Sequence, residues 1–425
     1  MRSARRPILV ADAGFAGTLA AVRSLGRNGV PTTVADPQPL APALWSRYAT
    51  RRVSHPPFDQ FGPFVEWLLE FGKREPRHVI CPTSDEFLFA LALHRDAVKE
   101  YFDVHLPPFS AVLDVLDKQA LYAHARAAGF HTPDTWLPTS DEEVVRVGRE
   151  ATFPLLVKPR MQVLLDTKSK GVIVRDPTEL AAAYARFTSR NRYGDALLVH
   201  TPDVRWPMLQ AYHPRAPEGI YVLSGFYDHE HKRAVALGAT KLLQRPRRLG
   251  IGLCFEEAQA EEHLVEAVKR MCERTGYYGI FQLEFIREGD RFLLIDFNPR
   301  FYNYLALDIA RGLALPEMVY AAAQGDSAEV TRLMDAVPQR GEEGQKTFCN
   351  RFGLGLLMGA QRLSQKMSAQ DADRWRSWWR ANQVRMVDSV QDPDDPTPAR
   401  IDVAWQLYLA ARHPRAFLRT VMFDA

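Results

Sequence analysis

One stretch, residues 279–300, constrains the fold of this chain most, because it reads as two apolar strands joined by a tight turn. Its sequence is GIFQLEFIREGDRFLLIDFNPR, and the turn is centred on Gly289. Two short runs of alternating apolar and polar residues around a glycine turn are typical of a β-hairpin. Glu284 lies in the first predicted strand. Asp296 and Asn298 lie two residues apart at the end of the second, so their side chains share one face.

Folding this hairpin brings two carboxylates and an amide oxygen together. Such hard oxygen ligands suit a Mg²⁺ ion that carries the phosphates of a nucleotide. Arg300 follows on the same parity and adds a cation for phosphate oxygens. The alternative is a half-exposed sheet edge with solvated Glu284 and Asp296. We favour a metal site formed by Glu284, Asp296 and Asn298, because both carboxylates lie in apolar strands, where an unpaired charge is costly.

The composition is that of an ordinary globular chain of 425 residues, of which 46% are hydrophobic and 25% charged. This length predicts two or three domains. The net charge of +3, from 54 basic and 51 acidic residues, does not suggest a nucleic-acid partner. No apolar run is long enough for a transmembrane helix, so we expect no stable membrane insertion. The four cysteines have no metal-binding or redox spacing, which favours reduced thiols in a cytoplasmic protein: Cys81, Cys254, Cys272 and Cys349.

Residues 1–110 are predicted to form a Rossmann-like α/β domain. A buried strand over 7–11 is followed by a helix and a second strand, which gives a βαβ unit. Its turn carries Gly14 and Gly17, but Asp12 stands where a dinucleotide-binding fingerprint has its first glycine. We therefore interpret the two glycines as serving a close turn and helix packing rather than nucleotide binding.

A further strand of this domain, over 78–82, also leads into a helix through a polar turn, Thr83-Ser84-Asp85-Glu86. The turn lies at the carboxyl end of a parallel strand, where α/β sheets usually bind ligands. Thr83 or Ser84 could equally cap the helix that follows. Helix capping and substrate contact are both open for these four residues.

Further along, apolar runs predict strands over 153–158, 196–200 and 207–212, the first of which ends in Lys158. A basic, glycine-bounded segment runs over 241–252; it is open to interpretation as a phosphate-binding loop or as a solvated surface.

Two segments complete the chain. Residues 326–345 are charged and predict a linker, and residues 346–425 predict a helical extension. Trp375, Trp378 and Trp379 gather on one short helix of this extension. We favour core packing for these aromatics over a membrane-surface helix, because aromatic residues at helical spacing usually face a core.

Taken in order, these motifs resemble the ATP-grasp superfamily, and within it the carboxylate–amine and carboxylate–thiol type ligases with a C-terminal helical extension. Asp117-Lys118 followed by Gly129 and Pro133 is similar to the helix with the first nucleotide lysine. Phe153-Pro154 with Val157-Lys158-Pro159 is similar to the strand with the second. Gln210-Ala211-Tyr212 stands at the adenine hinge, and Lys241 on the strand that faces the phosphates. Glu284, Asp296, Asn298 and Arg300 match the metal and phosphate motif in their spacing.

The resemblance implies an α/β fold: the N-terminal Rossmann-like domain, then an ATP-grasp domain over 111–325 with an α+β nucleotide site. That domain would have subdomains 111–206 and 207–325, followed by the linker and the extension. Lys118, Lys158, Gln210, Ala211, Tyr212 and Lys241 would bind ATP, and Arg300 and Lys241 would act in catalysis. Mg²⁺, or Mn²⁺ in its place, would be the metal.

The implied activity is ligation of a small carboxylic acid to an amine through an acyl phosphate, by a monomer or an oligomer. Three departures from the family pattern concern the site: Asp296 stands where glutamate is usual, Gln210 where glutamate is common, and the loop over 160–171 lacks the glycines of many members. Two rival functions stay open, namely a phosphotransferase acting on a small molecule and a non-catalytic nucleotide-binding protein. A nicotinamide-dependent oxidoreductase is disfavoured by the glycine missing at Asp12.

Overall fold

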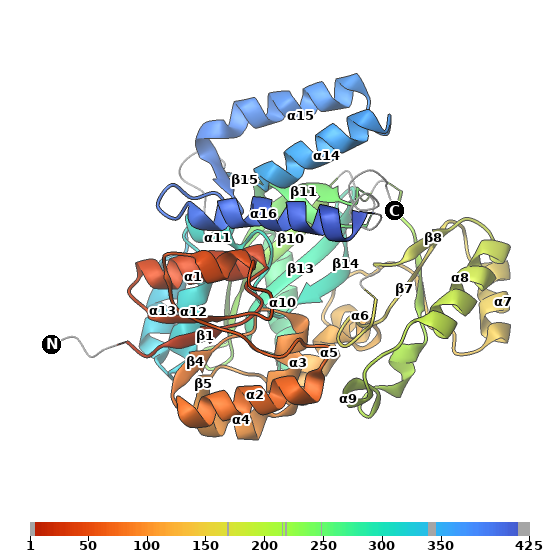
Figure 1. Ribbon diagram of the computed structural model, residues 1–425. Coiled ribbons are helices and arrows are strands. Elements are labelled where there is room, and N and C mark those ends of the chain that lie inside the picture. The colour runs from red at the N-terminus through yellow and green to blue at the C-terminus, as the bar shows by residue number, and fades with distance from the viewer. Residues whose placement is uncertain are drawn as a thin grey trace.

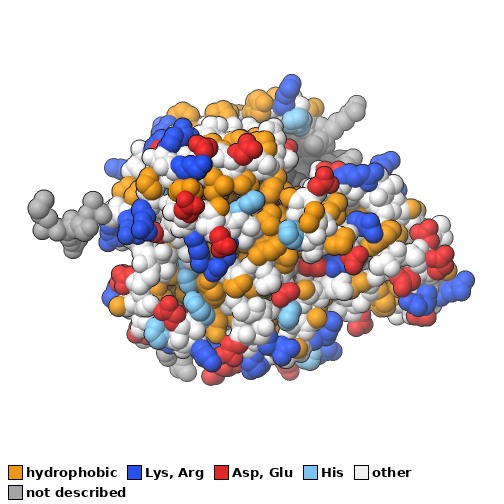
Figure 2. All heavy atoms as spheres, turned by 90° about the horizontal axis from the view of Figure 1, so that it is seen from below, with side chains coloured by type: hydrophobic (Ala, Val, Ile, Leu, Met, Phe, Trp, Pro, Cys, Tyr) orange, Lys and Arg blue, Asp and Glu red, His pale blue; other side chains and the backbone are white. Residues whose placement is uncertain are grey.

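The computed structural model shows helices and strands grouped around three β-sheets (Figure 1). The described residues are 5–167, 170–214, 216, 219–247, 249–338 and 346–414. Within these ranges, no helix combines the length and the apolar character needed to cross a membrane. Positive and negative side chains are interspersed on the face drawn in Figure 2, in agreement with the nearly balanced composition.

The first sheet is parallel and forms the predicted N-terminal α/β domain. In the order β3-β2-β1-β4-β5, its strands are Ala49–Val53, Thr32–Ala35, Ile8–Val10, His78–Ile80 and Phe102–Val104. Helix α1 (Ala16–Arg27) packs on one face, and α2 (Phe61–Arg74), α3 (Asp85–Leu93) and α4 (Arg95–Tyr101) pack on the other. The central strands are buried on both faces, and they are mostly apolar as such a sheet requires.

The turns of this domain support two of the sequence interpretations. A Cβ atom at Gly17 would lie 2.4 Å from the backbone oxygen of Tyr302, so only glycine permits this close packing of α1. Ser84 caps α3, because its side chain accepts a hydrogen bond from the amide of Phe87. The packing role of Gly17 and the capping role of Ser84 are confirmed.

The second sheet has seven strands and is antiparallel except for its last pair. In the order β14-β13-β10-β11-β12-β15-β16, they are Arg291–Asn298, Gly279–Glu288, Ile220–Asp228, Arg233–Arg245, Ile251–Ala258, Thr347–Cys349 and Met386–Asp388. One face packs on α5 (Phe109–Leu116), α6 (Lys118–Ala127) and α10 (Glu262–Thr275). The other packs on α11 (Leu305–Ala310) and α12 (Leu315–Ala323), against which α1 also packs. The N-terminal domain therefore shares a core with this sheet.

The third sheet has four strands in the order β6-β9-β7-β8, namely Thr135–Trp136, Met208–Ala211, Leu155–Lys158 and Val172–Val174. Helices α7 (Asp141–Glu150) and α8 (Pro177–Arg190) pack on it. The strand predicted over 196–200 is wrong, because a short helix, α9 (Asp195–Leu198), stands there. A short apolar run does not distinguish strand from helix by itself, and Leu197 of this run is buried in the core of the N-terminal domain.

The C-terminal region contains more than the predicted helices. It has α14 (Arg351–Leu363), α15 (Ala369–Asn382) and α16 (Thr397–Arg412), but β15 and β16 also extend the second sheet. The buried apolar segment around Phe348 pairs with β12, which explains why a helix is not formed there. The predicted linker is likewise partly helical, with α13 over Ser327–Asp335. Residues 339–345 and 415–425 of these predicted segments lie outside the described ranges.

The aromatic cluster of α15 packs inward, as predicted. Trp375 is buried in a core with Leu357 and Cys254, and Trp378 and Trp379 pack against that core. All four cysteines are buried and free, in agreement with the prediction of unpaired core thiols.

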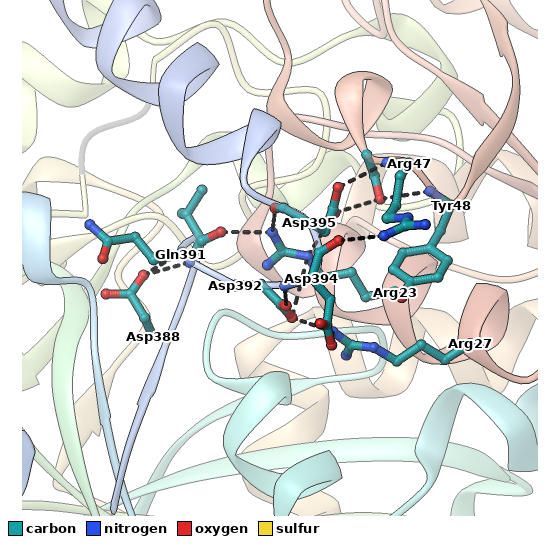
Figure 3. A network of polar contacts seen from close by, with 11 residues as sticks. Arg23, Arg27, Arg47, Tyr48, Asp388, Gln391, Asp392, Asp394 and Asp395 are labelled. Atoms are coloured by element: carbon teal, nitrogen blue, oxygen red, sulfur yellow. Dashed lines mark hydrogen bonds and ion pairs between the residues drawn. The ribbon is translucent and has the colours of Figure 1, made fainter. Parts of the chain in front are cut away.

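A polar network fastens the chain between β16 and α16 to the N-terminal domain (Figure 3). The carboxylate of Asp395 is 1% exposed and accepts hydrogen bonds from Nε of Arg23 at 3.0 Å and from Oγ of Ser46 at 2.7 Å. Arg23, in α1, also donates to the backbone oxygen of Val390 at 2.7 Å. The buried ion pair between Arg23 and Asp395 thus connects the C-terminal region to the N-terminal domain.

We expect Asp395→Ala to lower the free energy of unfolding by about 3–5 kcal/mol, because it leaves Arg23 charged and buried without its carboxylate. Urea unfolding followed by circular dichroism measures this change. Asp394→Ala is the matched control, because the side chain of Asp394 is 74% exposed. Equal stability of the two variants would contradict the assignment.

Candidate active site

The hairpin predicted from the sequence is formed by β13 and β14. Gly289, with a φ of +61°, makes the turn between them. Glu284 pairs with Asp296 across the hairpin, and Gln282 pairs with Asn298 in the same way. Because side chains alternate along each strand, these four share one face of the hairpin. The structure therefore brings Glu284, Asp296 and Asn298 together; their role as metal ligands stays a prediction.

Glu284 and Asp296 are each held by a lysine from another element. Nζ of Lys118 lies 2.8 Å from Oδ1 of Asp296, and Nζ of Lys241 lies 2.7 Å from Oε2 of Glu284. Lys118 is the first residue of α6, whereas Lys241 lies within β11. The basic segment is therefore strand at Lys241, and this lysine faces the hairpin; its role toward phosphates stays a prediction.

The pairing of Lys118 with Asp296 shifts the protonation of both groups. Burial alone would raise the pKa of Asp296, but Lys118, Lys170 and Lys158 outweigh it and lower this pKa to about 2. Burial would lower the pKa of Lys118, and the charge of Asp296 outweighs this, so that the pKa lies above its ordinary value. Both groups are therefore charged throughout the physiological pH range.

Among the described residues, Lys158 forms no ion pair with a carboxylate. It ends β7, is buried, and donates to Oε1 of Gln210 at 3.0 Å. Nε2 of Gln210 in turn donates to the hydroxyl of Tyr122 at 2.9 Å, and this hydroxyl donates to the backbone oxygen of Ile295. Burial and the nearby charge of Lys118 lower the pKa of Lys158 to about 7. The surroundings of this lysine therefore do not fully compensate its positive charge.

The predicted adenine hinge, Gln210-Ala211-Tyr212, lies at the end of β9. The amide of Ala211 donates to the backbone oxygen of Asp134 at 2.9 Å, and the amide of Tyr212 donates to that of Pro154 at 3.1 Å. The roles of Gln210, Ala211 and Tyr212 in adenine binding stay predictions. Contact through these amides would require an exchange of partners.

Arg300 joins the hairpin to the N-terminal domain. Its Nε lies 3.0 Å from Oδ1 of Asp85, and its Nη2 donates to Oδ1 of Asn298 at 2.8 Å. Burial would lower the pKa of Arg300, but the charge of Asp85 outweighs burial and raises it. The polar turn that precedes α3 therefore reaches the site through Asp85, whereas Ser84 of the same turn is a helix cap.

Comparisons with known proteins bear on this arrangement. No protein-family model matches the chain. Over 242 residues, the chain is 23% identical to the large chain of carbamoyl phosphate synthase from Thermus thermophilus. This match covers 54% of the chain and only 22% of the length of that protein.

Solved structures with a similar architecture match a larger share of the chain. The biotin carboxylase domain of 2-oxoglutarate carboxylase from Hydrogenobacter thermophilus matches with a TM-score of 0.59 and 15% identity, over 76% of this chain and 70% of that one. The L-amino acid ligase from Bacillus licheniformis matches with a TM-score of 0.54 and 14% identity, over 77% of each chain. The chain has the ATP-grasp fold. The resemblance stated from the sequence is thereby confirmed at the level of the fold.

Within this ATP-grasp fold, the site gathers residues from the second and third sheets and from helices α3 and α6. Four cations, Lys118, Lys158, Lys241 and Arg300, face three carboxylates, Glu284, Asp296 and Asp85. The side chains of Glu284 and Asp296 are 24% and 30% exposed, so a ligand can reach them. An excess of positive charge beside oxygen ligands fits a metal ion together with an anionic polyphosphate.

Sequence reasoning missed several residues of the candidate site. Oε1 of Gln282 accepts a hydrogen bond from Nδ2 of Asn298 at 2.6 Å. Gln282 lies two residues before Glu284 on the same strand, so the alternation of side chains could have placed it at the site. Tyr122 follows Lys118 by four residues, so the two share a helix face, which was a usable signal.

A further missed pair is Asp117 and Arg160. Nε of Arg160 lies 3.1 Å from Oδ1 of Asp117, the residue that caps α6. This ion pair ties the loop after β7 to the helix that begins with Lys118. No local pattern relates two residues so far apart in the chain, so the sequence carried no signal for it. Lys168 of the same loop lies outside the described residues.

Proposed function

We propose that the chain is an ATP- and Mg²⁺-dependent ligase that joins a small carboxylic acid to an amine through an acyl phosphate. One observation carries the proposal: the two carboxylates predicted to bind the metal, Glu284 and Asp296, are each held by a lysine, at 2.7 and 2.8 Å. The carboxylates can exchange these lysines for a divalent cation, and the freed ammonium groups can bind the phosphates that accompany it. The arrangement suits a metal–polyphosphate complex better than a metal or an anion alone.

The similar proteins support this proposal. The biotin carboxylase domain was solved with MgADP and bicarbonate, and the Bacillus protein is named an L-amino acid ligase. Both names describe enzymes that act on a small carboxylate, and the first includes the magnesium nucleotide that the hairpin would suit. A carboxylic acid and an amine are therefore the substrate classes that we assign to the chain.

Glu284, Asp296 and Asn298 would hold Mg²⁺, or Mn²⁺ in its place, because they offer the oxygen ligands that these ions prefer. When bound, the metal neutralises charge on the phosphoryl group during its transfer. Arg300 already holds Oδ1 of Asn298 at 2.8 Å, so it stands beside the position of the metal.

The chain's own cations would carry the other part of the reaction. A carboxylate oxygen of the acid attacks the γ-phosphorus of ATP, the bond to ADP breaks, and an acyl phosphate forms. The amine then attacks the carbonyl carbon, and phosphate leaves. Lys118, Lys158 and Lys241 would neutralise and orient the phosphates, since phosphoryl transfer depends on position and charge. Arg300 would stabilise the oxyanion formed when the amine attacks.

The test measures ADP release from MgATP with a pool of small carboxylic acids that carry no amine, and a pool of primary amines, including amino acids, added or omitted. We expect release above the background of Asp296→Asn only when both pools are present. Deconvolution of the pools then identifies the substrates.

Two outcomes would overturn the proposal. Release with a single pool, together with a stable phosphorylated product, would indicate the phosphotransferase. Binding of MgADP without any release, under every combination of pools, would indicate the non-catalytic protein.

A further inference from the structure

Asp12 occupies an unusual backbone position at the end of β1. Its φ is +54°, in the left-handed region that glycine adopts most readily. Its carboxylate is anchored, because the hydroxyl of Thr83 donates to Oδ2 at 3.1 Å. Thr83 follows β4, which pairs with β1 in the parallel sheet. Asp12 therefore lies at the carboxyl ends of two neighbouring strands, where sheets of this kind bind ligands.

Three contacts place this sheet edge beside the proposed site. Asp85, two residues after Thr83, is the partner of Arg300 at 3.0 Å. The amide of Phe301 donates to the backbone oxygen of Pro82 at 3.3 Å. Gly17, at the start of the helix that follows Asp12, packs against the backbone of Tyr302. The chain after Arg300 thus runs directly along the turns that carry Asp12 and Thr83.

The surroundings of Asp12 suit a group that accepts a proton. Burial raises the pKa of Asp12 to about 7, with contributions from Glu86 and Asp36 in the same direction, while hydrogen bonds from Ser84 and Thr83 oppose the shift. The residue as a whole is only partly buried. The main contributions to this shift include no cation. A proton acceptor works best when its pKa lies near the working pH.

We propose that Asp12 is the general base that deprotonates the amine substrate. We further propose that this substrate is an aliphatic amine, which is an ammonium ion in neutral water. This inference rests on the ligase proposed above. An ammonium has no lone pair, so it must lose a proton before it attacks the acyl phosphate. That proton goes to the carboxylate of Asp12 and then to solvent. The amine nitrogen forms the C–N bond, the C–O bond to phosphate breaks, and the second nitrogen proton leaves with the phosphate.

A purely structural role for Asp12 makes a different prediction. Glycine or asparagine would satisfy the left-handed turn as well as aspartate does. Asp12→Asn keeps the shape and the hydrogen-bond acceptor for Thr83 but cannot take a proton from an ammonium. This variant therefore separates proton transfer from support of the turn.

The experiment compares two nucleophiles in the wild-type protein and in Asp12→Asn, with MgATP and the pool of small carboxylic acids. One nucleophile is the pool of primary amines. The other is hydroxylamine, which is largely uncharged at neutral pH and yields a hydroxamate that forms a coloured complex with iron(III). We expect Asp12→Asn to lose about 10²-fold or more in the amine-dependent rate and to keep hydroxamate formation within a few-fold. The remaining amine-dependent rate should rise with pH, as more of the amine loses its proton. Asp96→Asn, an exposed change in the same domain, is the control.

Two results would overturn the inference while leaving the ligase proposal in place: full amine-dependent activity in Asp12→Asn, or an equal loss with both nucleophiles. Failure of the wild-type protein to form either product would instead overturn the ligase proposal, and this inference with it.

Discussion

Asp296→Asn should lower Mg-dependent ADP formation by about 10²–10³-fold, a loss typical of removing one charged group from a preorganised site. The carboxylate is ionised at every working pH, because its pKa is lowered to about 2 by Lys118 and the neighbouring lysines despite burial. The amide that replaces it binds a divalent cation more weakly. It can still accept a hydrogen bond from Lys118, so the fold should be retained.

The rate with substrate pools and the circular dichroism spectrum together test this expectation. Glu284→Gln should behave in the same way, because Glu284 faces Asp296 across the hairpin and is also held by a lysine. Asp290→Asn changes an exposed carboxylate of the same hairpin turn and serves as the matched control. Wild-type activity in Asp296→Asn would remove the metal assignment, whereas an unfolded variant would shift the test to Glu284→Gln.

Lys158→Met should abolish nucleotide binding and yet stabilise the free protein. The wild-type protein buries an ammonium group whose only side-chain hydrogen bond among the described residues is to an amide, Gln210. The methionine side chain is similar in length and has no charge to desolvate. We expect a gain of about 1–3 kcal/mol at pH 7, an order of magnitude that follows from a pKa lowered by several units. Loss of MgADP affinity with increased stability is the signature of a functional charge.

The pH dependence gives the sign of the effect. Unfolded, this lysine keeps its proton up to its ordinary pKa of 10.5, whereas the folded group loses it near 7. Between these values the unfolded state binds more protons, so the free energy of unfolding of the wild-type protein should rise with pH. The penalty is fully present below pH 7 and disappears toward pH 10.5. Lys158→Met should lack this rise.

Urea unfolding between pH 7 and 9, with titration calorimetry of MgADP, measures both effects. Lys366→Met, at an exposed position, is the control for a general effect of losing a lysine. If Lys158→Met were less stable than the wild-type protein at pH 7, this would contradict the view that Lys158 is a buried charge without a compensating carboxylate. Because phosphates would restore its charge, MgADP binding to the wild-type protein at pH 8 should also take up protons from the buffer.

Local pattern was sufficient for the elements that are built from neighbouring residues. The hairpin was predictable because its turn glycine and its two-residue alternation lie within one short stretch of chain. Glu284, Asp296 and Asn298 share a face for the same reason. Pattern was insufficient over 196–200, where a strand was predicted and a helix stands, because a short apolar run fits either element.

The C-terminal region contains elements that local sequence patterns could not predict. The segments of β15 and β16 are three residues long. They are strands because the edge of β12 offers hydrogen bonds to β15, and β15 in turn offers them to β16. The pairing of Asp395 with Arg23 likewise joins residues that lie far apart in the chain. No periodicity in the sequence encodes a contact of this kind.

The α/β class, the hairpin and the chemical types of the site residues could be predicted from the amino-acid sequence, because alternation, turn glycines and residue chemistry are local properties. The contacts between these groups could not be predicted without the three-dimensional structure. Lys118 meets Asp296, Lys241 meets Glu284, and Lys158 is left beside an amide. These partners depend on how the sheets and helices pack together, and packing is settled by the whole core. The protonation of each group depends on burial and on neighbouring charges, so it too follows from the fold and not from the residue type.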